Sequence, residues 1–256
     1  MVISSDRSRN GLMHDPRPRI AMVVCLAALA LGCGDDPRER VSNIYELKMD
    51  PTPANVEAIR GYLDDEDLQV RVTAMYQLVE LGVPDAQRLA LESLDDPEGF
   101  VRMMAAQQLR SFSDPEVARR LAERVIEDED SRVRRVAAES VAEVGGDVAI
   151  EVLGRCLTDP IAEVRKMCVE GLARLDPAVG VETLVRLLSE DPEWEVRVQA
   201  ARALGLSGDR SAMAALEAAT EDVHEYVRGA AAHALDRLRS APVAPEPATE
   251  QPLTPS

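Results

Sequence analysis

The chain has 256 residues, of which 46% are hydrophobic, enough to bury a core. It carries 29 Lys and Arg against 46 Asp and Glu, and this net charge of −17 argues against nucleic acid as a partner, because phosphate binding needs a basic surface. Aromatic residues make up only 3%, and the apolar residues are mostly Ala, Val and Leu, which favours closely packed helices.

The N-terminal segment has the order of an export signal. Residues 20–32 form an apolar run, IAMVVCLAALALG, that follows Arg17 and Arg19 and precedes Cys33. The run is too short to span a membrane comfortably. The basic residues, the apolar stretch and the small residue after it follow one another in the order that is typical of a secretory signal peptide. We therefore expect residues 1–32 to be a signal peptide.

The string Ala30-Leu31-Gly32-Cys33 resembles a bacterial lipoprotein lipobox, although Ala30 stands where Leu is usual. The resemblance implies that Cys33 is lipidated and holds the mature chain to a membrane of a bacterial cell envelope. Plain secretion and a retained anchor are the alternatives. Met1 and Met13 are both candidate starts.

Six copies of one signature run through residues 51–239. Each has a Val-Arg pair, 31 or 32 residues after the previous one, and an Asp five residues before the Val. The Asp and Arg residues are Asp65, Arg71, Asp96, Arg102, Asp128, Arg134, Asp159, Arg165, Asp191, Arg197, Asp222 and Arg228. This period predicts an all-α fold of six stacked helical hairpins.

Each hairpin has a predicted second helix that starts near the Val-Arg pair. A small residue four positions after the Val and a larger aliphatic eight after it define one apolar face, as Ala105 and Leu109 do. The Asp lies where this helix is expected to begin, so we predict that it caps the helix. The Arg is expected to pair with an Asp of the same or the next unit, forming a ladder.

The repeat resembles the HEAT family, in particular its short form, the PBS lyase HEAT-like repeats. The matching text includes DDPEGFVRMMAAQQL, DEDSRVRRVAAESVAEVGGD and TDPIAEVRKMCVEGLARL. The resemblance covers about residues 51–239 and implies a right-handed α-solenoid of about six hairpins. It is specific for fold and weak for function, because such repeats act as scaffolds in many settings.

Two segments flank the array. Residues 33–50 are expected to be a linker with a helix over VSNIYELKM that covers the first repeat, since an uncapped end exposes apolar surface. Residues 240–256, SAPVAPEPATEQPLTPS, hold five Pro and no apolar period, so we predict a disordered or extended tail.

The folded part offers little catalytic chemistry. Cys156 and Cys168 are predicted to be buried free thiols, because a symmetrical turn would set residue 168 opposite about residue 152, although export also permits a disulfide. His224 and His233 lack metal-ligand spacing, and no nucleophile elbow or phosphate loop is present. We predict no catalytic residue, no metal site and no cofactor.

A partner surface is predicted on the second helices, which line the concave face in HEAT proteins. Its residues in the middle repeats are Met103, Met104, Gln107, Arg135, Val136, Glu139, Lys166, Met167 and Glu170. Met is over-used at binding surfaces, and the alternative is that some of these Met belong to the core. Phe100, Trp194 and Tyr226 lie near the turns, where packing is favoured over anchoring a partner.

Three functions are open. The leading hypothesis is a non-catalytic scaffold, tethered to the membrane by Cys33, that binds a protein or peptide through its concave helix face. The PBS lyase resemblance implies a bilin lyase-like enzyme as the alternative, although the export signal conflicts with the cytoplasmic setting of such lyases. The third is a purely structural envelope protein without a discrete pocket.

Overall fold

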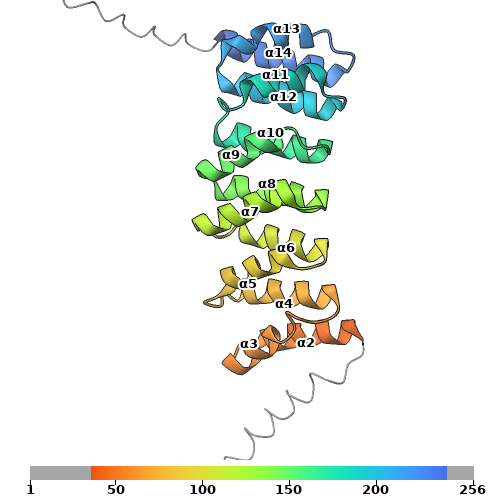
Figure 1. Ribbon diagram of the computed structural model, residues 1–256, viewed down its shortest axis with the longest axis vertical. Helices are drawn as coiled ribbons and strands as arrows, with labels where there is room; N and C mark the ends of the chain where they lie inside the picture. The colour runs from red at the N-terminus through yellow and green to blue at the C-terminus, as the bar shows by residue number, and fades with distance from the viewer. Residues whose placement is uncertain (1–35, 241–256) are drawn as a thin grey trace, which may run out of the picture. The chain divides into compact units, whose positions relative to one another are not determined.

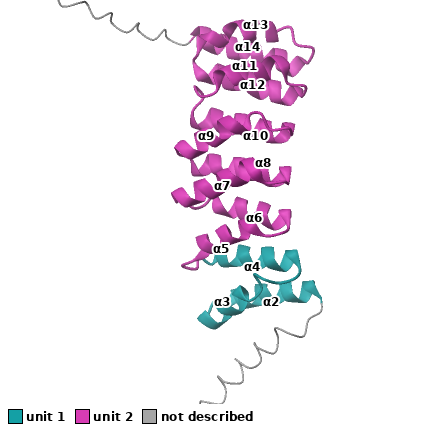
Figure 2. Ribbon diagram, viewed as in Figure 1, with its two compact units in different colours: residues 1–81 teal, residues 82–256 magenta. Residues whose placement is uncertain are grey.

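The computed structural model describes residues 36–240, which form thirteen α-helices and two short 3₁₀ helices without any strand (Figure 1). The predicted all-α class is thereby confirmed. The chain divides into two compact units, one up to Leu81 and one from Gly82 on (Figure 2). No helix among the described residues has the length and apolar character needed to cross a membrane.

Several predictions concern residues outside this range. The signal peptide at 1–32, the lipidation of Cys33 and the conformation of the tail from residue 241 on lie outside the described residues. They stay predictions.

The first unit contains three helices, α2 (Pro37–Met49), α3 (Pro53–Arg60) and α4 (Leu68–Glu80). α2 packs on both α3 and α4, and Ile44 of α2 and Ile59 of α3 are fully buried. α2 lies in the segment where a helix was expected ahead of the first repeat. The hairpin of that repeat is α3–α4.

The second unit consists of five hairpins, each of a first and a second helix. The first helices are α5 (Ala86–Glu92), α7 (Pro115–Glu127), α9 (Asp147–Cys156), α11 (Val181–Glu190) and α13 (Met213–Ala219). The second helices are α6 (Gly99–Leu109), α8 (Ser131–Val144), α10 (Ala162–Leu175), α12 (Trp194–Ser207) and α14 (Glu225–Ser240). The 3₁₀ helices are Ser93–Asp95 and Arg210–Ala212.

The second helices of this unit form one row, in which α6 packs on α8, α8 on α10, α10 on α12 and α12 on α14 (Figure 1). The small residue of the signature is buried in every copy: Ala74, Ala105, Ala137, Cys168, Ala200 and Ala231. A short side chain at this place lets neighbouring helices approach closely. The α-solenoid predicted from the repeat is confirmed.

Cys156 and Cys168 form a disulfide with their Cα atoms 5.9 Å apart, so the prediction of two free thiols is wrong. The turn between α9 and α10 is not symmetrical, because Arg165 Nη1 donates to the carbonyl oxygens of Asp159 (2.8 Å) and Pro160 (3.2 Å). Cys168 therefore lies beside the last residue of α9 instead of one turn beyond it.

Candidate functional site

The Arg of the signature joins neighbouring repeats. Arg165 Nε and Nη2 donate to the two carboxylate oxygens of Asp191, at 2.7 and 2.8 Å, while its Nη1 holds the turn of its own repeat. The two side chains are only 10% and 2% exposed. One guanidinium thus makes a bidentate ion pair between repeats and a backbone clamp within one.

The same arrangement recurs in both units. The Arg and Asp side chains that pair are Arg40 and Asp65 in the first unit, and Arg102 and Asp128, Arg134 and Asp159, Arg165 and Asp191, and Arg197 and Asp222 in the second. Arg71 and Arg228 make the clamp bonds too, to the carbonyl oxygens of Asp65 and Asp222, both at 2.8 Å. The structure therefore brings the predicted Asp and Arg together as a ladder.

The signature Asp does not cap the second helix, contrary to the prediction. Asp159 Oδ1 accepts the N–H of Ile161 at 2.8 Å, and Asp191 Oδ1 accepts that of Glu193 at 3.0 Å. Ile161 and Glu193 are themselves the N-cap residues of α10 and α12. The Asp thus shapes the turn two residues ahead of the N-cap residue, and its carboxylate also binds the Arg of the preceding repeat.

The ion pairs shift pKa values in the direction that keeps both partners charged. Hydrogen bonding to the paired carboxylate raises the pKa of Arg102 and of Arg165. In the last pair, the hydrogen bond from Arg197 lowers the pKa of the Asp222 carboxyl. The charges of the ladder are consequently paired with each other, and the ladder has a structural role.

One pair of the ladder was missed by sequence reasoning. Arg40 lies on α2, outside the six copies, and its Nε and Nη2 bind Asp65 at 2.9 and 3.0 Å. The sequence contains a signal for this pair, because Arg40 stands 25 residues before Asp65 and the same spacing separates Arg134 from Asp159. Glu39 stands where a full copy has Val. α2 therefore acts as the second helix of an incomplete repeat.

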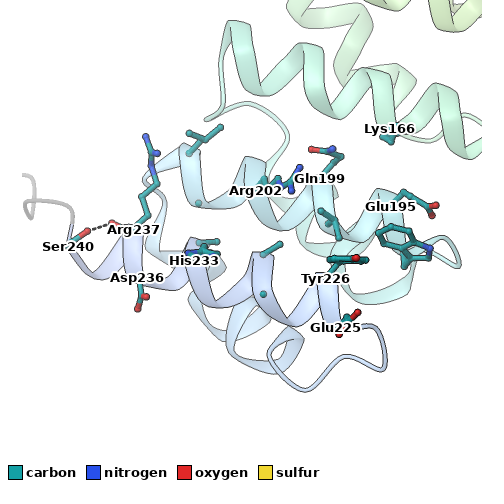
Figure 3. A pocket seen from close by; sticks show the side chains of 17 residues that line it. Lys166, Glu195, Gln199, Arg202, Glu225, Tyr226, His233, Asp236, Arg237 and Ser240 are labelled. Atoms are coloured by element: carbon teal, nitrogen blue, oxygen red, sulfur yellow. Dashed lines mark hydrogen bonds between the residues drawn. The ribbon is translucent and has the colours of Figure 1, made fainter.

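A groove of about 1220 Å³ lies along α12 and α14 (Figure 3). Tyr226 lines one end with Trp194 beside it, and Arg237 and Ser240 line the other; Lys166 of α10 also lines the groove. The lining residues two, three and six positions after the Val are Val198, Gln199 and Arg202 on α12 and Gly229, Ala230 and His233 on α14. This is the helix register predicted for a partner surface, but mainly in the last two repeats.

Glycine residues on α12 and α14 shape the groove. A Cβ added at Gly205 would lie 2.8 Å from the Cα and Cβ atoms of Ala234, so α12 and α14 are in close contact there. A Cβ added at Gly229 would meet nothing within 4 Å. The equivalent positions in α6 and α10 hold Met103 and Lys166. Gly229 therefore leaves the α14 part of the groove open, where Met103 and Lys166 place long side chains in earlier repeats.

Aromatic rings gather at one end of the groove. Trp194 stacks on His224 with ring centroids 4.1 Å apart, and Tyr226 lies 5.4 Å from Trp194. Trp194 thus packs on the turn before α14, which was the favoured prediction. Trp194 and Tyr226 also line the groove; Tyr226 is 61% exposed and available to a ligand, whereas Trp194 is half-buried. Phe100 is half-buried on α6, away from this cluster.

The residues of the partner surface predicted on the middle repeats are less exposed than Tyr226 of the groove, and most of them lie outside the groove. Its residues on α6, α8 and α10 are half-buried: Met103, Met104, Gln107, Arg135, Glu139, Lys166, Met167 and Glu170. Val136 is buried. Arg135 pairs with Glu139 at 3.7 Å, and Lys166 is the member of this set that lines the groove. The groove was not predicted, because it depends on how closely α12 approaches α14.

Three cations and three carboxylates line the groove, and the cations are not paired with those carboxylates. Within residues 36–240, its cations Lys166, Arg202 and Arg237 form no ion pair. Glu225 and Asp236 also line the groove but point to the side of α14 away from α12, and Glu195 stands near the aromatic end (Figure 3). Three cations are thus available in a chain whose net charge is −17.

The side chains that line the groove include one His and one Ser, both on α14. His233 and Ser240 lie seven residues apart on α14, about 10 Å along the axis, whereas a base and its nucleophile must be within hydrogen-bonding distance. No group of three His, Cys, Asp or Glu residues in the described part of the chain is placed to hold a metal. Aromatic rings, small residues and cations suit an extended ligand chain.

Several solved structures have a similar fold. YibA of Escherichia coli is 23% identical over 77% of this chain and 76% of its own, with a TM-score of 0.58. A designed armadillo repeat protein is 19% identical over 70% of this chain and 98% of its own, with a TM-score of 0.50. The CpcE–CpcF complex of phycocyanin lyase from Nostoc is 20% identical over 93% and 99%, but its TM-score of 0.46 is too low to bear on function.

Sequence comparison identifies the family. No curated protein matches the chain significantly. The family model of HEAT repeats matches residues 56–142, 90–173 and 150–236, which together span more than half of the chain. These are the residues that carry the six signatures and form the hairpins α3–α4 to α13–α14. The chain therefore belongs to the HEAT repeat family.

Proposed function

We propose that this protein is a non-catalytic scaffold that binds an extended segment of another protein through the second-helix face of its repeats, with the groove along α12 and α14 as the docking site. The groove is the observation that carries this proposal. It combines an apolar floor, the exposed ring of Tyr226 beside the half-buried Trp194, and three cations without ion pairs, all on helices fixed by the ladder. Aromatic and Arg side chains in such settings supply most of the energy of protein recognition.

We further propose that a lipid on Cys33 holds the scaffold at a membrane of the bacterial envelope. The disulfide between Cys156 and Cys168 supports export, because disulfides persist in oxidising compartments and are rare in the cytosol. A chain with Cys33→Ala is then expected in the soluble fraction and the wild type in the membrane fraction. Recovery of the wild type in the soluble fraction would contradict the anchor.

Pull-downs from detergent extracts test the docking site. The groove variant carries Arg202→Ala and Tyr226→Ala, two exposed residues whose loss leaves the core intact. A second variant carries Met103→Ala and Arg135→Ala in the middle repeats, outside the groove. We expect the groove variant to lose a protein that the wild type captures. Equal recovery by all three chains would refute binding through this helix face.

A further inference from the structure

The groove ends where the described chain ends. Ser240 is the last residue of α14 and lines the groove, as does Arg237 one turn earlier (Figure 3). The chain continues with APVAPEPATEQPLTPS, residues 241–256. The first residue of this C-terminal segment is therefore attached directly to one mouth of the groove.

We infer that the C-terminal segment, residues 241–256, turns back along α14 and occupies the groove in cis, where it competes with the partner. This inference concerns regulation of the proposed docking site and rests on the proposal that the groove binds extended chains.

The lengths fit this arrangement. α14 has 16 residues and is about 24 Å long. An extended proline-rich chain advances about 3.1 Å per residue, so about eight residues cover that length and the whole segment reaches about 50 Å. Residues near 245–247 would then lie beside Tyr226 and Trp194, at the far end of the groove. A segment much shorter than eight residues would not reach the rings.

The side chains are complementary. Pro245 and Pro247 present flat apolar rings, and proline-rich chains bind grooves lined by aromatic residues because their extended helix is preformed and loses little entropy. Tyr226 is exposed and Trp194 lines the same wall. Ala and Val residues between the prolines suit a floor made of Gly229 and Ala230.

The charges are complementary as well. The segment contains no Lys or Arg and carries Glu246 and Glu250. Lys166 and Arg202 lie on the α10–α12 side of the groove without an ion pair among the described residues (Figure 3). Because the segment is tethered at the groove, its effective concentration reaches the millimolar range, so even a weak fit suffices for occupancy.

Trp194 provides a site-specific readout, since it is the only Trp of the chain. Its fluorescence and its quenching by acrylamide are compared in the full chain and in a chain ended after Ser240. We expect the shortened chain to emit at longer wavelength and to lose protection from acrylamide, and the peptide 241–256 to reverse both changes. A peptide with Pro245→Ala, Glu246→Gln and Pro247→Ala is expected to have no effect.

Matched glycine variants separate occupancy from folding. Gly229→Leu fills the floor of the groove, and Gly154→Leu adds the same side chain on α9, where a Cβ likewise meets nothing within 4 Å. The Gly229→Leu chain should bind no peptide and Gly154→Leu should bind it normally. The inference is overturned if shortening leaves Trp194 unchanged, or if protection depends on protein concentration, which would assign the segment to a second copy. The partner pull-down needs no tail, so each proposal fails independently.

Discussion

Arg165 shows why the ladder cation must be Arg. Its planar guanidinium group donates hydrogen bonds to both carboxylate oxygens of Asp191 and to two backbone carbonyl oxygens. The ammonium group of Lys cannot reproduce this planar arrangement of donors. Breaking a buried pair leaves a charge without compensation, so Arg165→Lys should lower the free energy of unfolding by about 3 kcal/mol in urea titrations. Arg119→Lys, which alters an exposed pair with Glu116, should change nothing measurable. Equal losses in both variants would contradict the role of the ladder.

Asp222 predicts how stability depends on pH. Arg197 lowers its folded pKa below the ordinary value of 3.8, so the pair stabilises the fold above that value and the contribution is lost as pH falls through the folded pKa. Asp222→Asn should therefore be less stable than the wild type at pH 7, with a difference that shrinks below pH 3.8. Urea midpoints measured from pH 7 to pH 2 test this. Parallel curves for both chains would disprove it.

At the scale of single elements, the disulfide fastens α9 to α10. Cys156 and Cys168 are 12 residues apart, and closing a loop of that size stabilises a fold by about 3 kcal/mol in the chain-entropy account. A reductant should lower the urea midpoint of the wild type, whereas a double variant with Cys156→Ala and Cys168→Ala should not respond. A wild type that reacts fully with an alkylating agent before reduction would show that the bond is absent.

The contact between α12 and α14 depends on Gly205. Ala at this position would bring its Cβ to 2.8 Å from Ala234, so Gly205→Ala should destabilise the fold by about 1–3 kcal/mol. The same change at Gly154 meets nothing and should stabilise α9 by up to about 1 kcal/mol through helix propensity. Thermal unfolding compares the two variants. A stabilised Gly205→Ala chain would mean that the helices lie further apart.

For the whole molecule, the sequence predicts what every repeat shares. The hairpin and its Asp and Val-Arg signature recur six times, so an interpretation of one copy can be checked against five others. The role of the Asp was misassigned because the sequence does not show that the turn inserts two residues before the helix. The register of Cys156 against Cys168 depends on that same turn, which is why the thiol prediction failed.

The groove is harder to predict because it depends on residues of the last two repeats that differ from those at the same positions in the other repeats. Gly229 takes the place held by Met103 and Lys166 in earlier repeats, and Gly205 lets α14 approach. The general register of a partner surface follows from the helix period, whereas its location requires the distance between two helices. Function in this array therefore belongs to the positions that vary between copies.

Hydrogen exchange tests the central claim most directly. A chain that ends at Ser240 is compared with and without the protein captured by the wild type, so that the C-terminal segment contributes nothing. Binding through the groove predicts slower exchange in α12 and α14 and unchanged exchange in the first helices α5, α7 and α9. Protection confined to the first helices, or none at all, would contradict the account.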